Sequence, residues 1–186
     1  MTPIVLPKPG SPEPPTQPPR MIVEDFQNNL EWAILRQMLQ EAVLPEGTTV
    51  WVYPHRNRRS WRGEAVLAPR TYSVKTRVGR IFAPLIRVAV GKDISGETMS
   101  AYGQLEEHCK DRDEVIVYVL GHEAAHFVLD AQNKPGQRRR LPRGAETFCD
   151  KMGISFLKTY RERFADYKKQ AAQQRAAIGG LRGKKQ

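Results

Sequence analysis

The chain has 186 residues, 40% of them hydrophobic, and a formal net charge of +10. This length suits one compact domain with tails, and the longest apolar run, Val115 to Leu120, is far too short to cross a membrane. The N-terminus has no apolar core of the kind found in signal peptides, and the two cysteines impose no disulfide framework. We therefore expect a soluble cytoplasmic protein that has no membrane partner.

Residues 1–20 include eight prolines, a density that prevents helix formation and strand pairing. We predict an extended, disordered leader, and a proline-rich motif for a partner protein is the alternative. From Phe26 to Ala42 an apolar residue then recurs at every fourth position, which is one stripe of an amphipathic helix. Pro45 and Gly47 end this helix.

Strands are predicted in the middle of the chain. The segment TVWVYP, residues 49–54, alternates between inward and outward positions as a strand does. Further strands are predicted over residues 64–74 and 85–91, and a loop rich in small residues follows from Gly91 to Gly103.

The segment 113–130, DEVIVYVLGHEAAHFVLD, predicts a buried central helix. Its valines favour a strand, but the segment is too long for a typical strand, and Asp113 and Glu114 suit the start of a helix. After a basic loop, a second long helix is predicted over residues 144–167. These elements predict an α+β domain over residues 21–167, with a helix packed on a small mixed sheet, between the leader and a basic tail of residues 168–186. The tail begins as a helix and frays beyond Gly180.

The stretch HEAAH, residues 122–126, predicts a zinc site. On a helix, His122 and His126 stand about 6 Å apart along the axis, so both rings can bind one ion with Zn–N bonds of about 2.0 to 2.1 Å. On a strand they would lie about 13 Å apart, so the zinc site depends on the helix. Glu123 points beside the ion, where it can take a proton from water and pass it to the leaving amine. We therefore predict one Zn²⁺ ion and Glu123 as the catalytic base.

A catalytic zinc ion usually has three protein ligands. We predict Glu146 as the third, because it lies near the start of the next helix, across a loop long enough to turn the chain back. Asp150, four residues further on, can accept a hydrogen bond from the outer nitrogen of His122 and so orient its ring. Cys149 is a rival ligand, although a buried structural cysteine is the preferred interpretation.

HEAAH followed by a helix that begins ETFCD resembles the gluzincin pattern of zinc metallopeptidases. In that pattern, His122, His126 and Glu146 match the metal ligands and Glu123 matches the catalytic base. Asp150 matches the acid that hydrogen-bonds to a ligand histidine and orients its ring. The resemblance, which covers residues 113–160, implies a compact zincin-like domain and a zinc metalloendopeptidase that acts on a protein or peptide. The short chain is similar to the minigluzincins and to the ImmA/IrrE-type peptidases.

Two further features of the active site are expected. Larger gluzincins add a downstream His or Tyr that stabilises the oxyanion, and no His follows His126. Tyr160, Arg161 and Tyr167 are the candidate donors, with Tyr160 assigned first. The strand near Leu85–Val90 is expected to form the edge along which an extended peptide pairs.

The positive charge is concentrated in two segments. Residues 134–143 hold five Lys or Arg and residues 168–186 hold six, without any acid. Removing these eleven from the 30 basic residues leaves 19 against 20 acidic ones. Such segments bind nucleic-acid phosphates or simply solvate a surface. The alternative function is therefore a metal-containing nucleic-acid-binding or regulatory protein without peptidase activity. Its contacts would include four arginines of the loop, Arg138, Arg139, Arg140 and Arg143.

Overall fold

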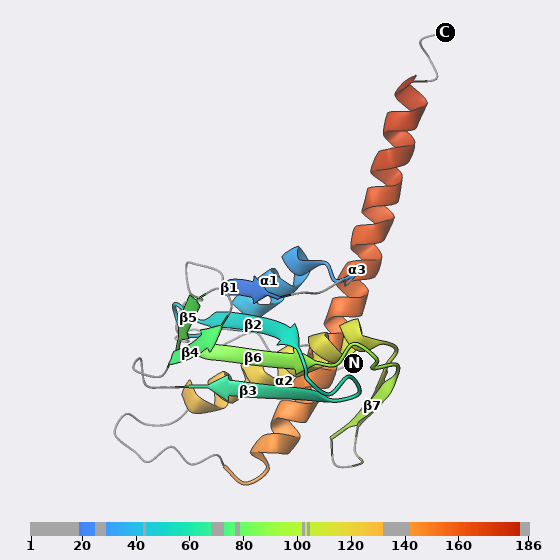
Figure 1. Ribbon diagram of the computed structural model, residues 1–186. Coiled ribbons are helices and arrows are strands. Elements are labelled where there is room, and N and C mark those ends of the chain that lie inside the picture. The colour runs from blue at the N-terminus through green and yellow to red at the C-terminus, as the bar shows by residue number, and fades with distance from the viewer. Residues whose placement is uncertain are drawn as a thin grey trace, which may run out of the picture.

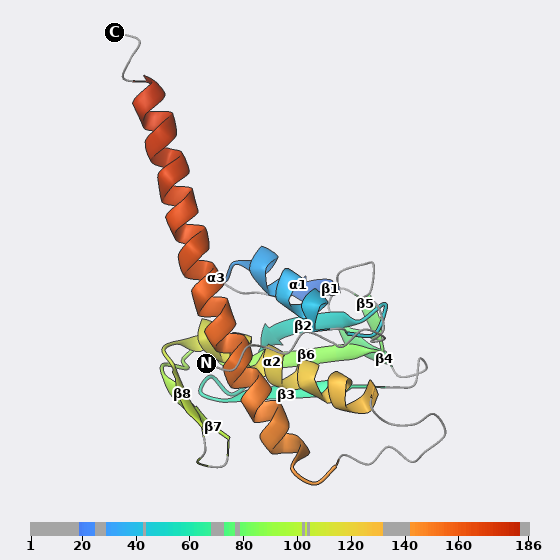
Figure 2. The same ribbon diagram turned by 180° about the vertical axis from the view of Figure 1, so that it is seen from behind.

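The computed structural model describes residues 19–24, 29–42, 44–67, 73–76, 79–101, 103, 105–131 and 142–182. Almost all of the predicted leader and most of the basic loop lie outside the described residues. Within the described part, three helices and eight strands are present, and the helices lie on one face of a mixed sheet (Figures 1 and 2). The α+β class is thereby confirmed.

The main sheet has four strands in the order β1 (Arg20–Val23), β2 (Thr49–Pro54), β6 (Leu85–Val90) and β3 (Trp61–Val66). The strands β1, β2 and β6 run parallel, whereas β3 runs antiparallel to β6. Because β6 pairs with a strand on each side, the prediction that it forms the free edge is wrong. On that side of the sheet, β3 is the edge strand.

Two hairpins complete the described strands, β4 (Ser73–Thr76) with β5 (Gly79–Phe82) and β7 (Glu97–Ser100) with β8 (Glu106–Cys109). The strands predicted at residues 49–54 and 85–91 are confirmed. The single strand predicted over residues 64–74 is wrong, since β3 ends at Val66 and β4 belongs to a separate hairpin. The predicted loop after Gly91 contains β7, which is a strand only because β8 pairs with it.

The three helices are α1 (Trp32–Glu41), α2 (Arg112–Ala131) and α3 (Ala145–Arg182). The predicted central helix is confirmed as α2. α1 begins later than the apolar stripe indicated, at the point where the Glu31 side chain accepts a hydrogen bond from the backbone N–H of Ala33. No described helix combines the length and the apolar character that a membrane crossing requires.

The core lies between the sheet and the helices. Alternate strand residues point toward the helices, because side chains of a strand alternate between its two faces. Val50 and Val52 of β2 and Ile86 and Val88 of β6 share one buried cluster with residues of all three helices. The other face of the sheet has a smaller cluster, which includes Trp51, Ile81 and Leu85. α2 is buried on most sides because it lies between the sheet and α3.

α2 and α3 pack closely at two glycines. A Cβ atom on Gly121 would lie 2.4 Å from Cβ of Phe156, and one on Gly153 would lie 2.8 Å from the ring of Tyr118. No side chain fits at such distances, so only glycine allows the two helices to approach this closely. The approach brings the first turns of α3 beside the HEAAH segment of α2.

A charged cluster joins α3, α2 and the β7–β8 hairpin. Arg161 of α3 donates to both carboxylate oxygens of Glu114 in α2, at 2.9 and 2.6 Å, and also to Glu107 of β8. Lys158 lies 3.0 Å from Glu107. Burial by itself raises the pKa of both glutamates, but the hydrogen bonds and charges of these cations outweigh it, so both pKa values are lowered.

We expect Arg161→Met to lower the free energy of unfolding by about 2 kcal/mol, because it leaves the partly buried Glu114 without its main partner and removes one of the two cations that hold Glu107. The matched control is Arg163→Met. It breaks a more exposed ion pair between Arg163 of α3 and Glu41 of α1 and should cost less than about 1 kcal/mol. Urea unfolding at pH 7 measures both values.

The same charged cluster makes the stability loss caused by Arg161→Met depend on pH. Folding lowers the pKa values of Glu107 and Glu114, so their contribution is present above the unfolded-state pKa of about 4.3 and is lost as pH falls through the folded-state values. The stability difference between the parent and Arg161→Met should therefore shrink when urea unfolding is repeated at acidic pH. A difference that stays constant with pH would contradict this account.

Candidate metal centre

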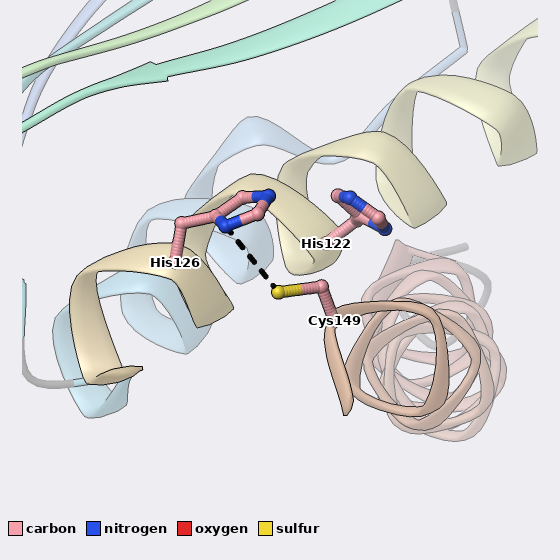
Figure 3. A group of neighbouring side chains, drawn as sticks. All are labelled: His122, His126 and Cys149. Atoms are coloured by element: carbon pink, nitrogen blue, oxygen red, sulfur yellow. Dashed lines mark hydrogen bonds between the residues drawn. The ribbon is translucent and has the colours of Figure 1, made fainter. Parts of the chain in front are cut away.

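His122 and His126 extend from the same side of α2 toward the start of α3 (Figure 3). Their ring centroids lie 5.2 Å apart, and both side chains are partly buried. Burial, together with the neighbouring His122, lowers the pKa of His126 below its ordinary value. The ring is therefore neutral at pH 7, and neutral imidazole is the form that binds metals.

Two carboxylates from the first two turns of α3 approach the ring of His122. Oε2 of Glu146 lies 3.5 Å from Nε2, and Oδ1 of Asp150 lies 3.0 Å from Nδ1. Although this second pair of atoms is close, Nδ1 makes no hydrogen bond in the observed geometry. Asp150 itself accepts a hydrogen bond of 2.8 Å from the hydroxyl of Tyr118. The structure thus brings both predicted acids of α3 to the two nitrogens of one histidine.

The thiol of Cys149 also reaches the centre. Its Sγ lies 3.5 Å from Nδ1 of His126 (Figure 3), and the side chain is completely buried. Burial raises the pKa of this thiol to about 12, and nearby carboxylates, chiefly Glu146, add to the shift. The ligand atoms of His122, His126 and Cys149 all lie within 4.8 Å of one another. These three residues could therefore hold a metal ion.

The distances and donors fit zinc. Two nitrogen or oxygen ligands of one tetrahedral zinc ion lie about 3.3 Å apart, and a nitrogen and a sulfur ligand about 3.6 Å apart, given bond lengths of about 2.0 to 2.3 Å. The contacts His122–Glu146 and His126–Cys149 both measure 3.5 Å. Imidazole, carboxylate and thiolate are all ligands that zinc accepts. Among the described residues, Cys149 is the third member of the group whose ligand atoms all lie within 4.8 Å of one another. Glu146 approaches His122 but does not join that group, so its side chain would have to move to bind the same ion as both histidines.

Glu123 is buried where α2 meets the edge strand β3. Only 6% of the residue is exposed, and its carboxylate accepts a hydrogen bond from the backbone of Ala65. Gly63 makes room for it, since a Cβ atom there would lie 2.1 Å from Oε1 of Glu123. Burial raises the pKa of Glu123 to about 8, with the charge of Glu146 adding to the rise and the Ala65 hydrogen bond opposing it.

Tyr160 is not part of this centre, contrary to the expectation that it stabilises the oxyanion. Its hydroxyl accepts a hydrogen bond from the backbone N–H of Glu31 at 2.9 Å, and its side chain belongs to the core. By the helical rise, Tyr160 lies about 21 Å along α3 from Glu146. Of the other two candidate donors, Arg161 is held by Glu107 and Glu114, and Tyr167 is exposed even further along α3.

Most of the basic loop lies outside the described residues. Arg138, Arg139 and Arg140 lie outside the described residues, and Arg143 is exposed just before α3 begins. Their predicted contacts with nucleic acid therefore stay predictions.

Sequence reasoning missed the roles of Tyr118 and Gly63. The role of Tyr118 could have been inferred from the sequence, because Tyr118 lies four residues before His122 and so shares its face of the helix. Its ring also packs edge-on against Trp61 of β3, with centroids 6.3 Å apart. The role of Gly63 could not have been inferred from the sequence, because its partner Glu123 is distant along the chain and close only in the fold.

Comparisons with known proteins assign no family to the chain, since no family model, no curated protein and no solved structure matches it. The chemistry of the centre has to be inferred from its own residues.

Proposed function

We propose that the chain is a zinc-dependent metallopeptidase of the gluzincin type. One arrangement of groups supports the proposal. Two imidazoles stand one helical turn apart, the carboxylate of Glu146 lies 3.5 Å from one of them, and the buried carboxyl group of Glu123 belongs to the residue between them. A general base beside a set of metal ligands is the combination that metal-assisted hydrolysis needs.

His122, His126 and Glu146 would hold the ion. When bound, zinc supplies Lewis-acid chemistry, because it polarises a carbonyl group and lowers the pKa of water toward 7. Glu146 is preferred over Cys149 because its side chain is 59% exposed and faces the solvent from which a substrate arrives, whereas the cysteine is buried. Oδ1 of Asp150 lies 3.0 Å from the other nitrogen of His122, a position from which a carboxylate can orient a ligand ring.

Glu123 performs the proton transfer. In its ionised form, Glu123 takes a proton from the attacking water and delivers it to the nitrogen of the leaving amine. The backbone of Ala65 holds this carboxylate by a hydrogen bond, and Gly63 leaves the space that it occupies. The base is therefore oriented before the substrate arrives, which keeps the entropic cost of the reaction low.

The peptide would lie along β3. Among the described strands, β3 pairs only with β6, so its outer edge is available for an extended chain to add as a further strand. The same strand contacts Glu123, so a peptide on this edge would pass close to the base. Trp61, of which 37% is exposed, offers an apolar surface at the start of the strand.

Metal removal tests the proposal. The purified full chain should contain about one zinc ion and hydrolyse an unfolded protein such as casein. A chelator should abolish hydrolysis, and about one equivalent of zinc should restore it. Zinc is measured by inductively coupled plasma mass spectrometry and hydrolysis by release of labelled peptides. Hydrolysis that survives complete removal of the metal would contradict the proposal, as would a fully zinc-loaded chain that cleaves neither casein nor a peptide library.

A further inference from the structure

The second half of α3 leaves the body of the molecule. Figures 1 and 2 show the helix packing against α2 near its start and then extending far away from the sheet. From residue 165 to residue 175, every residue except Ala171 is exposed. We call residues 165–182 the arm. As far as residue 175, its surface is solvated on nearly all sides, so this part contributes little to the core.

The arm is a helix because it continues one. A separate helix of this length would be marginal in water, since starting a helix costs more than extending one. The packed first half of α3 provides the start, and the alanines, glutamines, lysines and arginines of the arm are good helix formers. The fold therefore presents a preformed helical surface to whatever lies outside the molecule.

Beyond Asp166, the charge on the arm has one sign. Asp166 is the last acidic residue, and six Lys or Arg follow it. In the sequence, Lys168, Arg175 and Arg182 are spaced by seven residues. This spacing places the described Lys168 and Arg175 on one face of the helix, with a drift of about 20°. Lys169 stands next to this stripe. The residues between the cations are mainly alanine, glutamine and glycine, which carry no negative charge to neutralise it.

We propose that the arm binds the phosphate backbone of a nucleic acid. Cations held on a preformed helix can contact the phosphates of a nucleic acid, and each contact releases a counterion. A second copy of the arm is a poor partner, because two such helices would place like charges together. A membrane surface is also a poor partner, because it requires an apolar face opposite the charged one, and the arm has Asp166, Gln170 and Gln173 there.

The position of the arm defines what it can do. By the helical rise, Lys168 lies about 33 Å along α3 from Glu146, and Arg182 about 54 Å. The phosphates that the arm contacts therefore lie about 30 Å or more from the metal centre. These contacts tether the protein and take no part in chemistry at His122 and His126. The inference does not depend on the proposed peptidase activity, because binding can be measured without any substrate.

Two charge-matched variants test the inference. The arm variant carries four Gln substitutions at Lys168, Lys169, Arg175 and Arg182. The control variant carries four at exposed basic residues of the body, Arg20, Arg36, Arg80 and Lys92. Fluorescence anisotropy measures the binding of each full chain to a labelled DNA duplex of about 20 base pairs, and to single strands of DNA and RNA, over a range of salt concentrations.

The parent should bind with an affinity that falls linearly with salt on logarithmic axes. For duplex DNA, the arm variant should show a slope shallower by about 2 to 4, because each lost phosphate contact removes about 0.9. The control variant should keep the parent slope. Circular dichroism should show an unchanged helix content, since glutamine is nearly as good a helix former as lysine.

Three results would overturn the inference. The first is a parent that shows no salt-dependent binding to any of the three probes. The second is an equal loss in the control and arm variants, which would mean that net charge alone is responsible. The third is a parent that self-associates in sedimentation experiments and an arm variant that does not, while both bind nucleic acid equally well. The arm would then be a contact between two copies.

Discussion

Glu123→Gln should lower kcat for peptide hydrolysis by about 100- to 10,000-fold and leave the zinc in place. The amide has nearly the same shape as the carboxylate and can still accept the hydrogen bond from Ala65, so the packing against Gly63 is kept. What the amide cannot do is take a proton from water. The measurement is kcat on a labelled peptide together with zinc content.

Glu162→Gln is the matched control, because this glutamate is exposed on α3 and outside the centre. It should change neither kcat nor zinc content. If Glu123→Gln turns over at the parent rate, Glu123 is not the base and the mechanism fails. If it loses zinc instead, Glu123 is a ligand, and the assignment of the ligands has to be revised.

Glu146→Gln should weaken zinc binding by more than about 100-fold, whereas Cys149→Ser should change it by less than about tenfold. The larger effect is expected because a neutral amide replaces an anionic ligand, and even residues that only orient a ligand contribute about 10- to 100-fold. Competition with a chromophoric chelator measures both affinities. Thermal unfolding of the zinc-free forms shows whether either substitution disturbs the fold itself.

The pair of variants also separates the competing ligand sets. If only Cys149→Ser loses zinc, the thiol is the third ligand and Glu146 has no role in binding. If both variants lose zinc, the ion has four protein ligands and no open position, as structural zinc sites do. That result would contradict the peptidase proposal and favour a metal-containing protein that acts through binding. The inference about the arm would not be affected, because it is tested by a separate measurement.

Local spacing was enough to predict much of the centre. His122 and His126 are four residues apart, and a helix places such residues on one side whatever surrounds it. The same rule predicted that Glu146 and Asp150 would approach together, and both contact His122. Its limit is visible at Tyr160. The predicted helix already implied a separation of about 21 Å from Glu146, but local spacing could not predict that the backbone of the distant Glu31 donates to the Tyr160 hydroxyl.

The sequence by itself determined the helix α2, the histidine pair, the class of the fold and the concentration of positive charge near the C-terminus. Only the tertiary structure decided that β3, rather than β6, is the edge strand beside Glu123, that the thiol of Cys149 lies against His126, and that the basic tail projects as part of α3. The first group depends on residues within a few positions of one another, whose geometry the backbone dictates. The second depends on pairing and packing between distant segments, where many arrangements share the same local pattern and only the complete core selects one.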